Sequence, residues 1–86
     1  MESSIRGLRV DQSLDVRGQE GPSGYQQAVE RLRAMDENAV LELYLDEGEA
    51  LRIIPFGLRA EGHEILVSEP VTNGVRLLVR KRSLVT

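Results

Sequence analysis

The 86-residue sequence contains no cysteine, which excludes disulfide bonds, thiolate catalysis and cysteine-ligated zinc. Aromatic side chains are also scarce, since only Tyr25, Tyr44 and Phe56 are present. Few aromatic rings are therefore available to stack with bases, which disfavours a role in binding single-stranded nucleic acid. His63 is the only histidine, so no histidine-based metal site can form, and we expect neither a metal nor a cofactor.

Long apolar runs are missing as well. No stretch approaches the roughly 20 apolar residues of a membrane span, and no basic-then-apolar signal opens the chain, so we expect a cytoplasmic protein without membrane contact. The apolar share of 41% and the net charge of −3 argue against global disorder. The length suits one domain, which we place at residues 13–82, between a flexible N-terminal tail (1–12) and a short C-terminal tail (83–86).

The first half of the domain predicts a strand followed by a helix. Alternation over residues 13–17 indicates a strand with one apolar face. Ser23 and Gln26 have the spacing of a capping box at the start of a helix. That helix carries one apolar stripe at helical spacing, formed by Tyr25, Ala28, Val29, Leu32 and Met35.

A second strand and a second helix follow. Residues 39–45 alternate, with three leucines on one face: Leu41, Leu43 and Leu45. Asp46 and Glu49 predict another capping box, before a helix over 49–61 that ends near Gly62. Pro55 interrupts this helix, so we expect a kink or two short helices.

The last part of the domain predicts a hairpin of two strands, over 64–70 and 75–80, joined by an Asn73-Gly74 turn. The element order is therefore β-α-β-α-β-β. Because the strands alternate, only one face of the sheet is covered, and the fold class is an α/β (α+β) two-layer sandwich with two helices on one face of a four-stranded mixed sheet. The expected core is Leu14, Val16, Val29, Leu32, Leu41, Leu43, Ile54, Leu58, Val67, Leu77 and Val79.

The stretch over residues 14–24 resembles a motif of the TusA/SirA-like sulfur-carrier family, whose first strand ends in Asp-x-Arg-Gly and whose first helix opens with Cys-Pro-x-Pro. Four residues match this motif: Asp15, Arg17, Gly18 and Pro22. Gly21 stands in the cysteine position and Gly24 in that of the second proline. Ile54-Pro55, Gly62-His63 and the closing run 77–81 also match the family pattern, so the resemblance covers about residues 14–81.

The resemblance implies a carrier whose cysteine receives sulfur as a persulfide from a desulfurase and passes it to a partner protein. A persulfide needs a cysteine sulfur, and Gly21 has no side chain, so we expect no catalytic residue and no enzyme activity. The leading hypothesis is a non-catalytic protein-binding or regulatory module related to sulfur-transfer pathways. Its candidate partner-binding residues are Arg17, Glu20, Gly21, Pro22, Ser23 and Phe56.

Two alternatives stay open. The loop at the first helix, with Ser23 and Arg17 beside it, has the groups of a small-anion site, although Ser23 as a simple cap explains the same residues. A basic cluster in the hairpin suits RNA or an acidic partner, or else forms a solvated edge: Arg76, Arg80, Lys81 and Arg82. Phe56 is either an exposed contact or a core residue, and we expect a structural role for His63.

Overall fold

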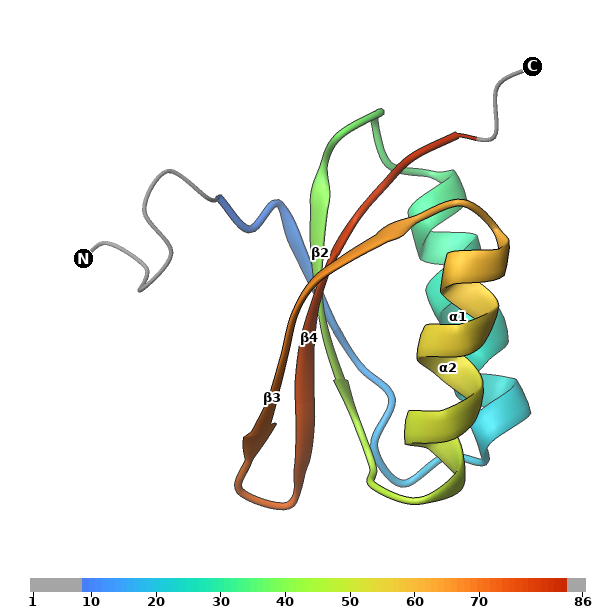
Figure 1. Cartoon of the computed structure of the whole chain (residues 1–86), viewed down its shortest axis with the longest axis vertical. Helices are drawn as coiled ribbons and strands as arrows, with labels where there is room; N and C mark the ends of the chain where they lie inside the picture. The colour runs from blue at the N-terminus through green and yellow to red at the C-terminus, as the bar shows by residue number, and fades with distance from the viewer. Residues whose placement is uncertain (1–8, 84–86) are drawn as a thin grey trace.

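The computed structural model describes residues 9–83, which form four strands and two helices (Figure 1). The elements follow one another in the predicted β-α-β-α-β-β order. Their bounds are β1 Gln12–Asp15, α1 Gly21–Arg33, β2 Val40–Leu45, α2 Glu49–Ala60, β3 Glu64–Val71 and β4 Gly74–Arg80.

The strands form one mixed sheet in the order β1-β2-β4-β3. β1 and β2 are parallel because α1 connects them as a crossover, whereas β4 is antiparallel to both β2 and β3. Both helices lie on the same side of the sheet, side by side (Figure 1). The predicted two-layer α/β sandwich is therefore confirmed.

The core lies between the sheet and the two helices. Leu41, Leu43 and Leu45 of β2 are fully buried, as the alternation predicted, and Leu32, Ile54 and Leu58 of the helices meet them. Leu14 is partly buried at the edge of this cluster. The helices come close because α1 presents Gly21, Gly24 and Ala28 on its buried side.

Val67 does not belong to this core, so that prediction is wrong. A bulge between Ile65 and Val67 shifts the pairing of β3, and Val67 pairs with Leu78 instead of Leu77. Paired residues of antiparallel strands share a face, so Val67 lies on the face without helices. Ile65 packs against the core in its place.

Both predicted capping boxes are wrong. α1 begins at Gly21, with Glu20 as the N-cap residue and Pro22 in the first turn, so Ser23 lies inside the helix and caps nothing. At α2 the N-cap residue is Gly48, whose φ of 88° favours glycine, and its cap has no side-chain hydrogen bond. Asp46 instead accepts a hydrogen bond from the Gly18 N–H at 2.8 Å.

α2 is a single helix through Pro55, so of the expected alternatives, a kink or two short helices, the two short helices are wrong. Pro55 is buried together with Ile54 and Leu58, and their packing holds the turns on both sides of the proline against the rest of the domain. Gly62 follows the helix with a φ of 100°, as expected for a C-terminal stop. No helix among residues 9–83 is long and apolar enough to cross a membrane.

Ordered contacts extend slightly beyond both expected domain ends. Asp11 and Val40 exchange two hydrogen bonds, from the Asp11 N–H to the Val40 carbonyl and from the Val40 N–H to the Asp11 carboxylate. Ser83 donates to Glu37 from both its N–H and its hydroxyl group. The rest of the predicted tails, residues 1–8 and 84–86, lies outside the described residues.

Candidate functional site

The loop between β1 and α1 is built around Arg17. Its guanidinium donates to both carboxylate oxygens of Asp15, from Nε at 3.0 Å and from Nη2 at 2.7 Å. This bidentate pair sits at the exposed end of β1, and the hydrogen bonds from Arg17 lower the pKa of the Asp15 carboxyl. The Asp-x-Arg spacing thus makes a local clamp, in which the Arg17 backbone N–H also donates to the Asp15 carboxylate at 3.0 Å, just beyond the end of β1.

Arg17 also reaches other strands. Its guanidinium carbon lies 5.0 Å from the centre of the Tyr44 ring on β2, in cation–π geometry. Nη1 donates to the Thr72 carbonyl in the β3–β4 turn at 3.3 Å. Arg17 therefore joins three parts of the molecule, and its charge is engaged within the chain.

A backbone contact fixes the other side of the loop. Gly18 has a φ of 86°, in the left-handed region, and its N–H points at Asp46 in the β2–α2 loop. The Asp46 carboxylate accepts at 2.8 Å, so the segments that precede the two helices are tied together. The loop is held in one shape by this contact and by Arg17.

Gly21, the residue in the cysteine position of the resemblance, is buried at the first position of α1. A Cβ atom added there would lie 3.1 Å from the Cδ1 of Ile53 and 3.6 Å from the Glu49 carboxylate oxygen Oε1, both on α2. At Gly24 an added Cβ would lie 3.1 Å from the Cγ2 of Val16. Both glycines thus face neighbouring elements closely.

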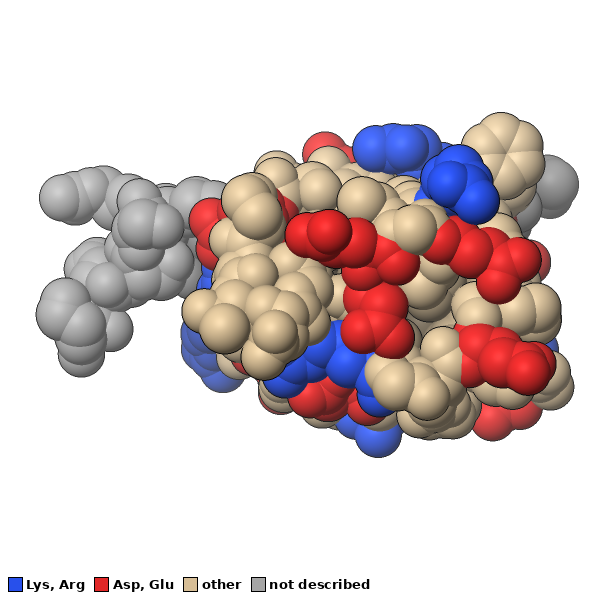
Figure 2. Space-filling model, turned by 90° about the horizontal axis from the view of Figure 1, so that it is seen from below, with Lys and Arg blue, Asp and Glu red and all other residues tan. Residues whose placement is uncertain are grey.

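The candidate residues Glu20, Pro22 and Ser23 are exposed beside the buried Gly21. Acidic residues from the adjoining β2–α2 loop and the start of α2 join Glu20 at this end of the molecule: Asp46, Glu47 and Glu49. Figure 2 shows this end, with acidic groups across the middle of the face. A partner meeting the loop therefore meets exposed polar and acidic side chains.

Phe56 is 75% exposed, so of the two predicted roles the core role is wrong. It lies on the outer side of α2, seven residues beyond Glu49, which corresponds to roughly 10 Å along the helix axis. The structure brings Glu20, Gly21, Pro22 and Ser23 together at the start of α1, whereas Phe56 lies about two helical turns beyond Glu49 along α2.

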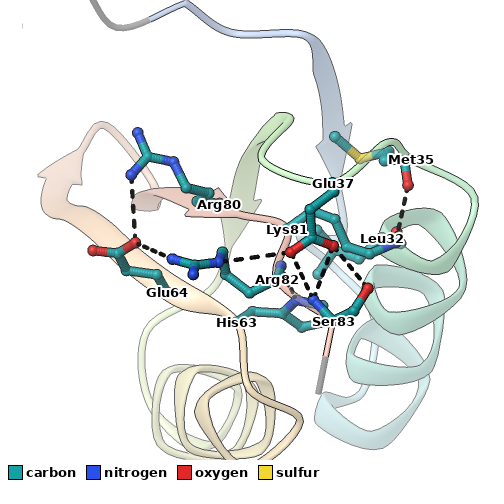
Figure 3. Close-up of polar contacts among 9 residues, drawn as sticks. All are labelled: Leu32, Met35, Glu37, His63, Glu64, Arg80, Lys81, Arg82 and Ser83. Atoms are coloured by element: carbon teal, nitrogen blue, oxygen red, sulfur yellow. Dashed lines mark hydrogen bonds and ion pairs between the residues drawn. The ribbon is translucent and has the colours of Figure 1, made fainter. Parts of the chain in front are cut away.

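The basic residues of the hairpin lie largely at the opposite end of the molecule, and they are engaged internally (Figure 3). The Lys81 ammonium donates to the carbonyl oxygens of Leu32 and Met35, at 2.8 and 2.9 Å. Arg80 and Arg82 both approach Glu64, at 3.4 and 3.7 Å. Arg76, farther along β4, pairs with Glu42 at 2.7 Å and with Glu69 at 2.6 Å.

His63 has a structural contact at this end, as expected. Its Nδ1 accepts a hydrogen bond from the Arg82 backbone N–H at 3.1 Å, so the neutral ring carries its proton on Nε2 (Figure 3). Burial lowers the pKa of His63, and the positive charge of Lys81 lowers it further. A hollow of about 540 Å³ lies beside the ring, lined in part by Arg59 and Arg82.

Sequence reasoning missed several of these contacts. The Lys81 cap on α1 joins residues 49 positions apart and left no local signal. Gly57 makes room for Tyr25, because a Cβ added at Gly57 would collide with the Tyr25 ring. A glycine inside a predicted helix was a usable signal for such a close approach.

Comparison with known proteins agrees with this geometry. The profile of the family described as "Sulfurtransferase TusA" matches residues 12–81, which include all four strands and both helices up to the Lys81 cap. A curated protein of Archaeoglobus fulgidus described as "Putative sulfur carrier protein" is 30% identical over 66 residues, covering 77% of this chain and 75% of that protein. The chain therefore belongs to the TusA sulfurtransferase family.

Proposed function

We propose that this member of the TusA family is a non-catalytic module that binds a protein partner of a sulfur-transfer pathway and regulates it. One observation carries the proposal: Gly21 occupies the position of the family's cysteine, and the 86 residues contain no other cysteine. A persulfide carrier needs a sulfur atom as nucleophile and as cargo site. Protein binding requires only a shaped surface.

The loop geometry supports a docking role. Arg17 and the Gly18–Asp46 hydrogen bond hold the loop in place, while Glu20, Pro22 and Ser23 remain exposed. A loop held by a rigid scaffold suits recognition, because little conformational entropy is lost on binding. Arg17 and Gly21 contribute to this role through the shape of the loop.

The surroundings of Gly21 further support the absence of sulfur chemistry. The Glu49 carboxylate faces the position where a side chain would begin, with Oε1 3.6 Å from an added Cβ. A nearby negative charge disfavours a thiolate or a persulfide anion and so opposes nucleophilic sulfur. The position therefore lacks both the sulfur atom and a favourable electrostatic environment for one.

The alternative binders have less support. An RNA site in the hairpin needs available positive charges, but Arg76, Arg80 and Arg82 pair with carboxylates and Lys81 caps α1. A small-anion site at the loop needs Arg17, which is committed to Asp15 and Thr72. We therefore favour a protein as the partner.

The missing sulfur chemistry is tested by incubating the chain with a cysteine desulfurase and cysteine, and measuring its intact mass. We expect no gain of a sulfur atom. A sulfur adduct that a thiol reductant removes would refute the proposal. A desulfurase assay on an active TusA-family carrier run in parallel verifies that sulfur transfer occurs under the same conditions.

Partner binding is tested by capture from the source cell, followed by a direct affinity measurement with the purified partner. Glu20→Lys should weaken binding, because Glu20 is exposed at the loop. Asp36→Lys is the matched control, since it makes the same charge change on an exposed residue beyond the far end of α1. Failure to recover a partner with the wild type, or equal affinities for the wild type and Glu20→Lys, counts against docking through the loop. Arg17→Glu is unsuitable because it removes the loop's own contacts.

A further inference from the structure

The outer side of α2 carries an exposed aromatic residue between two arginines. Arg52, Phe56 and Arg59 are spaced by four and three residues, so they lie on one side of the helix. The opposite side of α2 is fully buried through Ile54 and Leu58. We call the three exposed residues the α2 stripe.

Phe56 is the most exposed large apolar side chain of the described residues, at 75%, while the other exposed one, Val10, stands at 38%. A phenyl ring in water contributes nothing to the core of its own domain. Its position at the centre of the α2 stripe favours a contact surface, because aromatic side chains are typical anchors of protein interfaces.

The two arginines of the α2 stripe differ from most arginines elsewhere in the described chain, although Arg33 on α1 is likewise exposed and forms no ion pair within residues 9–83. Arg17, Arg76, Arg80 and Arg82 each pair with a carboxylate. Within residues 9–83, neither Arg52 nor Arg59 forms an ion pair, and both side chains are exposed. Their charge is therefore available for another molecule.

The stripe is locally positive on a chain whose net charge is −3. In Figure 2, blue groups lie together at the upper right, on the side of α2, while red groups occupy the middle of the face. The acidic residue on the same side of α2 is Glu49, one turn before Arg52, so Phe56 itself is flanked by arginines. This arrangement is complementary to an apolar side chain flanked by carboxylates.

We propose that the α2 stripe binds an acidic segment of the partner protein, with an apolar side chain of that segment against Phe56 and carboxylates on Arg52 and Arg59. The inference rests on the proposed function in that it assumes a protein partner. It adds a second contact surface and the chemistry of the segment that meets it. Arginine suits this role because its planar guanidinium pairs with a carboxylate through two parallel hydrogen bonds.

The proposal is tested by NMR titration of the full chain with a synthetic peptide of Glu, Asp and Leu, and with a matched peptide that has Lys in place of each acid. The acidic peptide should shift the amide signals of Arg52, Phe56 and Arg59, with an affinity that falls as salt rises. Phe56→Ala should weaken binding by about fivefold or more, the equivalent of about 1 kcal/mol. Absence of shifts with the acidic peptide, or equal shifts with the lysine peptide, would overturn the proposal.

Matched variants separate the stripe from general charge. Arg52→Glu should weaken the acidic peptide strongly, whereas Arg33→Glu, the same change on an exposed arginine of α1, should have little effect. Equal weakening by both variants overturns the proposal. If an oligouridine strand shifts the same amide signals more strongly than the acidic peptide does, the α2 stripe binds nucleic acid. That result also overturns the proposal of an acidic protein segment.

The partner experiment keeps the two proposals apart. If a captured partner depends on Glu20 but binds the Arg52→Glu/Arg59→Glu variant as tightly as the wild type, the loop function stands and the stripe proposal fails. If the wild type captures no partner, the proposed function fails, while the peptide titration still decides what the stripe binds. If Glu20→Lys and Arg52→Glu/Arg59→Glu each lose the partner, the result supports binding through both the loop and the α2 stripe.

Discussion

The Lys81 ammonium donates a hydrogen bond to the Leu32 carbonyl at 2.8 Å, although the two residues lie 49 positions apart in the sequence. The same ammonium caps the Met35 carbonyl at 2.9 Å. The residue after β4 thus adds a charged donor at the end of α1, to the Leu32 carbonyl, which also accepts from the Met35 N–H at 3.0 Å, and to the Met35 carbonyl.

Replacing Lys81 should destabilise the domain. We expect Lys81→Met to lower the free energy of unfolding by about 1–2 kcal/mol, because two carbonyls lose a charged donor. The urea midpoint measures this loss. Arg82→Met is the control, with an expected change within about 0.5 kcal/mol, because the Arg82 side chain is half exposed and its ion pairs are long. Equal losses in both variants would show that the cap is not specific.

The stability should depend on pH through His63. Its pKa in the folded chain is lowered from the ordinary 6.5, first by burial and then by Lys81. The unfolded chain therefore binds a proton more readily, so the free energy of unfolding falls as the pH drops below about 6.5 and levels off below the folded-state pKa. A proton on Nδ1 also removes the acceptor for the Arg82 N–H.

His63→Gln provides the comparison, since glutamine offers an acceptor without titrating. The carboxyls with lowered pKa, such as Glu37 and Glu42, titrate below the ordinary 4.5, so the interval from about pH 5 to 7 belongs to the single histidine. Urea unfolding at several pH values should show a flatter profile for His63→Gln. An unchanged slope in this interval would assign the effect to other groups.

The two glycines at the start of α1 should respond in opposite directions to alanine. At Gly24 the new Cβ lies 3.1 Å from Cγ2 and 3.2 Å from Cβ of Val16, which a hydrogen bond to Tyr44 holds in place. Gly24→Ala should therefore cost about 1–2 kcal/mol through overpacking.

At Gly21 the close neighbour is the flexible end of Ile53, which can move aside. Gly21→Ala should leave the stability unchanged or raise it by about 0.5 kcal/mol, through the better helix propensity of alanine. Thermal and urea unfolding of both variants measure the contrast. A loss at Gly21 as large as the one at Gly24 would contradict it.

Introducing a cysteine at position 21 tests the electrostatics of the site. In Gly21→Cys, the Glu49 carboxylate should raise the thiol pKa, so Gly21→Cys/Glu49→Gln should have the lower value. The expected difference is roughly 0.5–1 unit, because a unit charge about 4 Å away in a water-like medium contributes about 1 kcal/mol. The pH dependence of alkylation by iodoacetamide gives both values. Identical values would mean that Glu49 does not face the introduced thiol.

Local patterns predicted the elements well where burial follows a regular period. Leu41, Leu43 and Leu45 alternate along β2, and all three are fully buried. The bulge in β3 was not predictable in this way, because Ile65, Leu66 and Val67 are all apolar and leave no alternation to indicate the register.

The capping boxes failed for a related reason. Spacing identified a plausible acceptor at Ser23 and at Asp46, but it could not show where the backbone turns into a helix. α1 begins two residues before Ser23, and Asp46 bonds to Gly18, 28 positions earlier. Tertiary contacts thus decided which group each side chain meets.

The candidate site was only partly predictable. The motif placed Arg17, Gly18 and Gly21 close together around the first loop; the structure has Arg17 and Gly18 in that loop and Gly21 as the first residue of α1. The direction of the Arg17 side chain depends on Thr72, which lies 55 positions away in the sequence. A local sequence pattern therefore cannot predict that direction. The exposure of Phe56 likewise depends on how α2 packs as a whole, and its position after a proline gave only a hint.

The bulge in β3 has a consequence for how this domain meets other chains. β3 is an edge strand, and an incoming strand needs an evenly spaced row of backbone groups along such an edge. The bulge between Ile65 and Val67 breaks that spacing, and Pro70 has no N–H to offer. The other edge, β1, is only four residues long. Both edges of the described sheet are thus poorly suited to strand addition and to the edge-to-edge aggregation that follows from it.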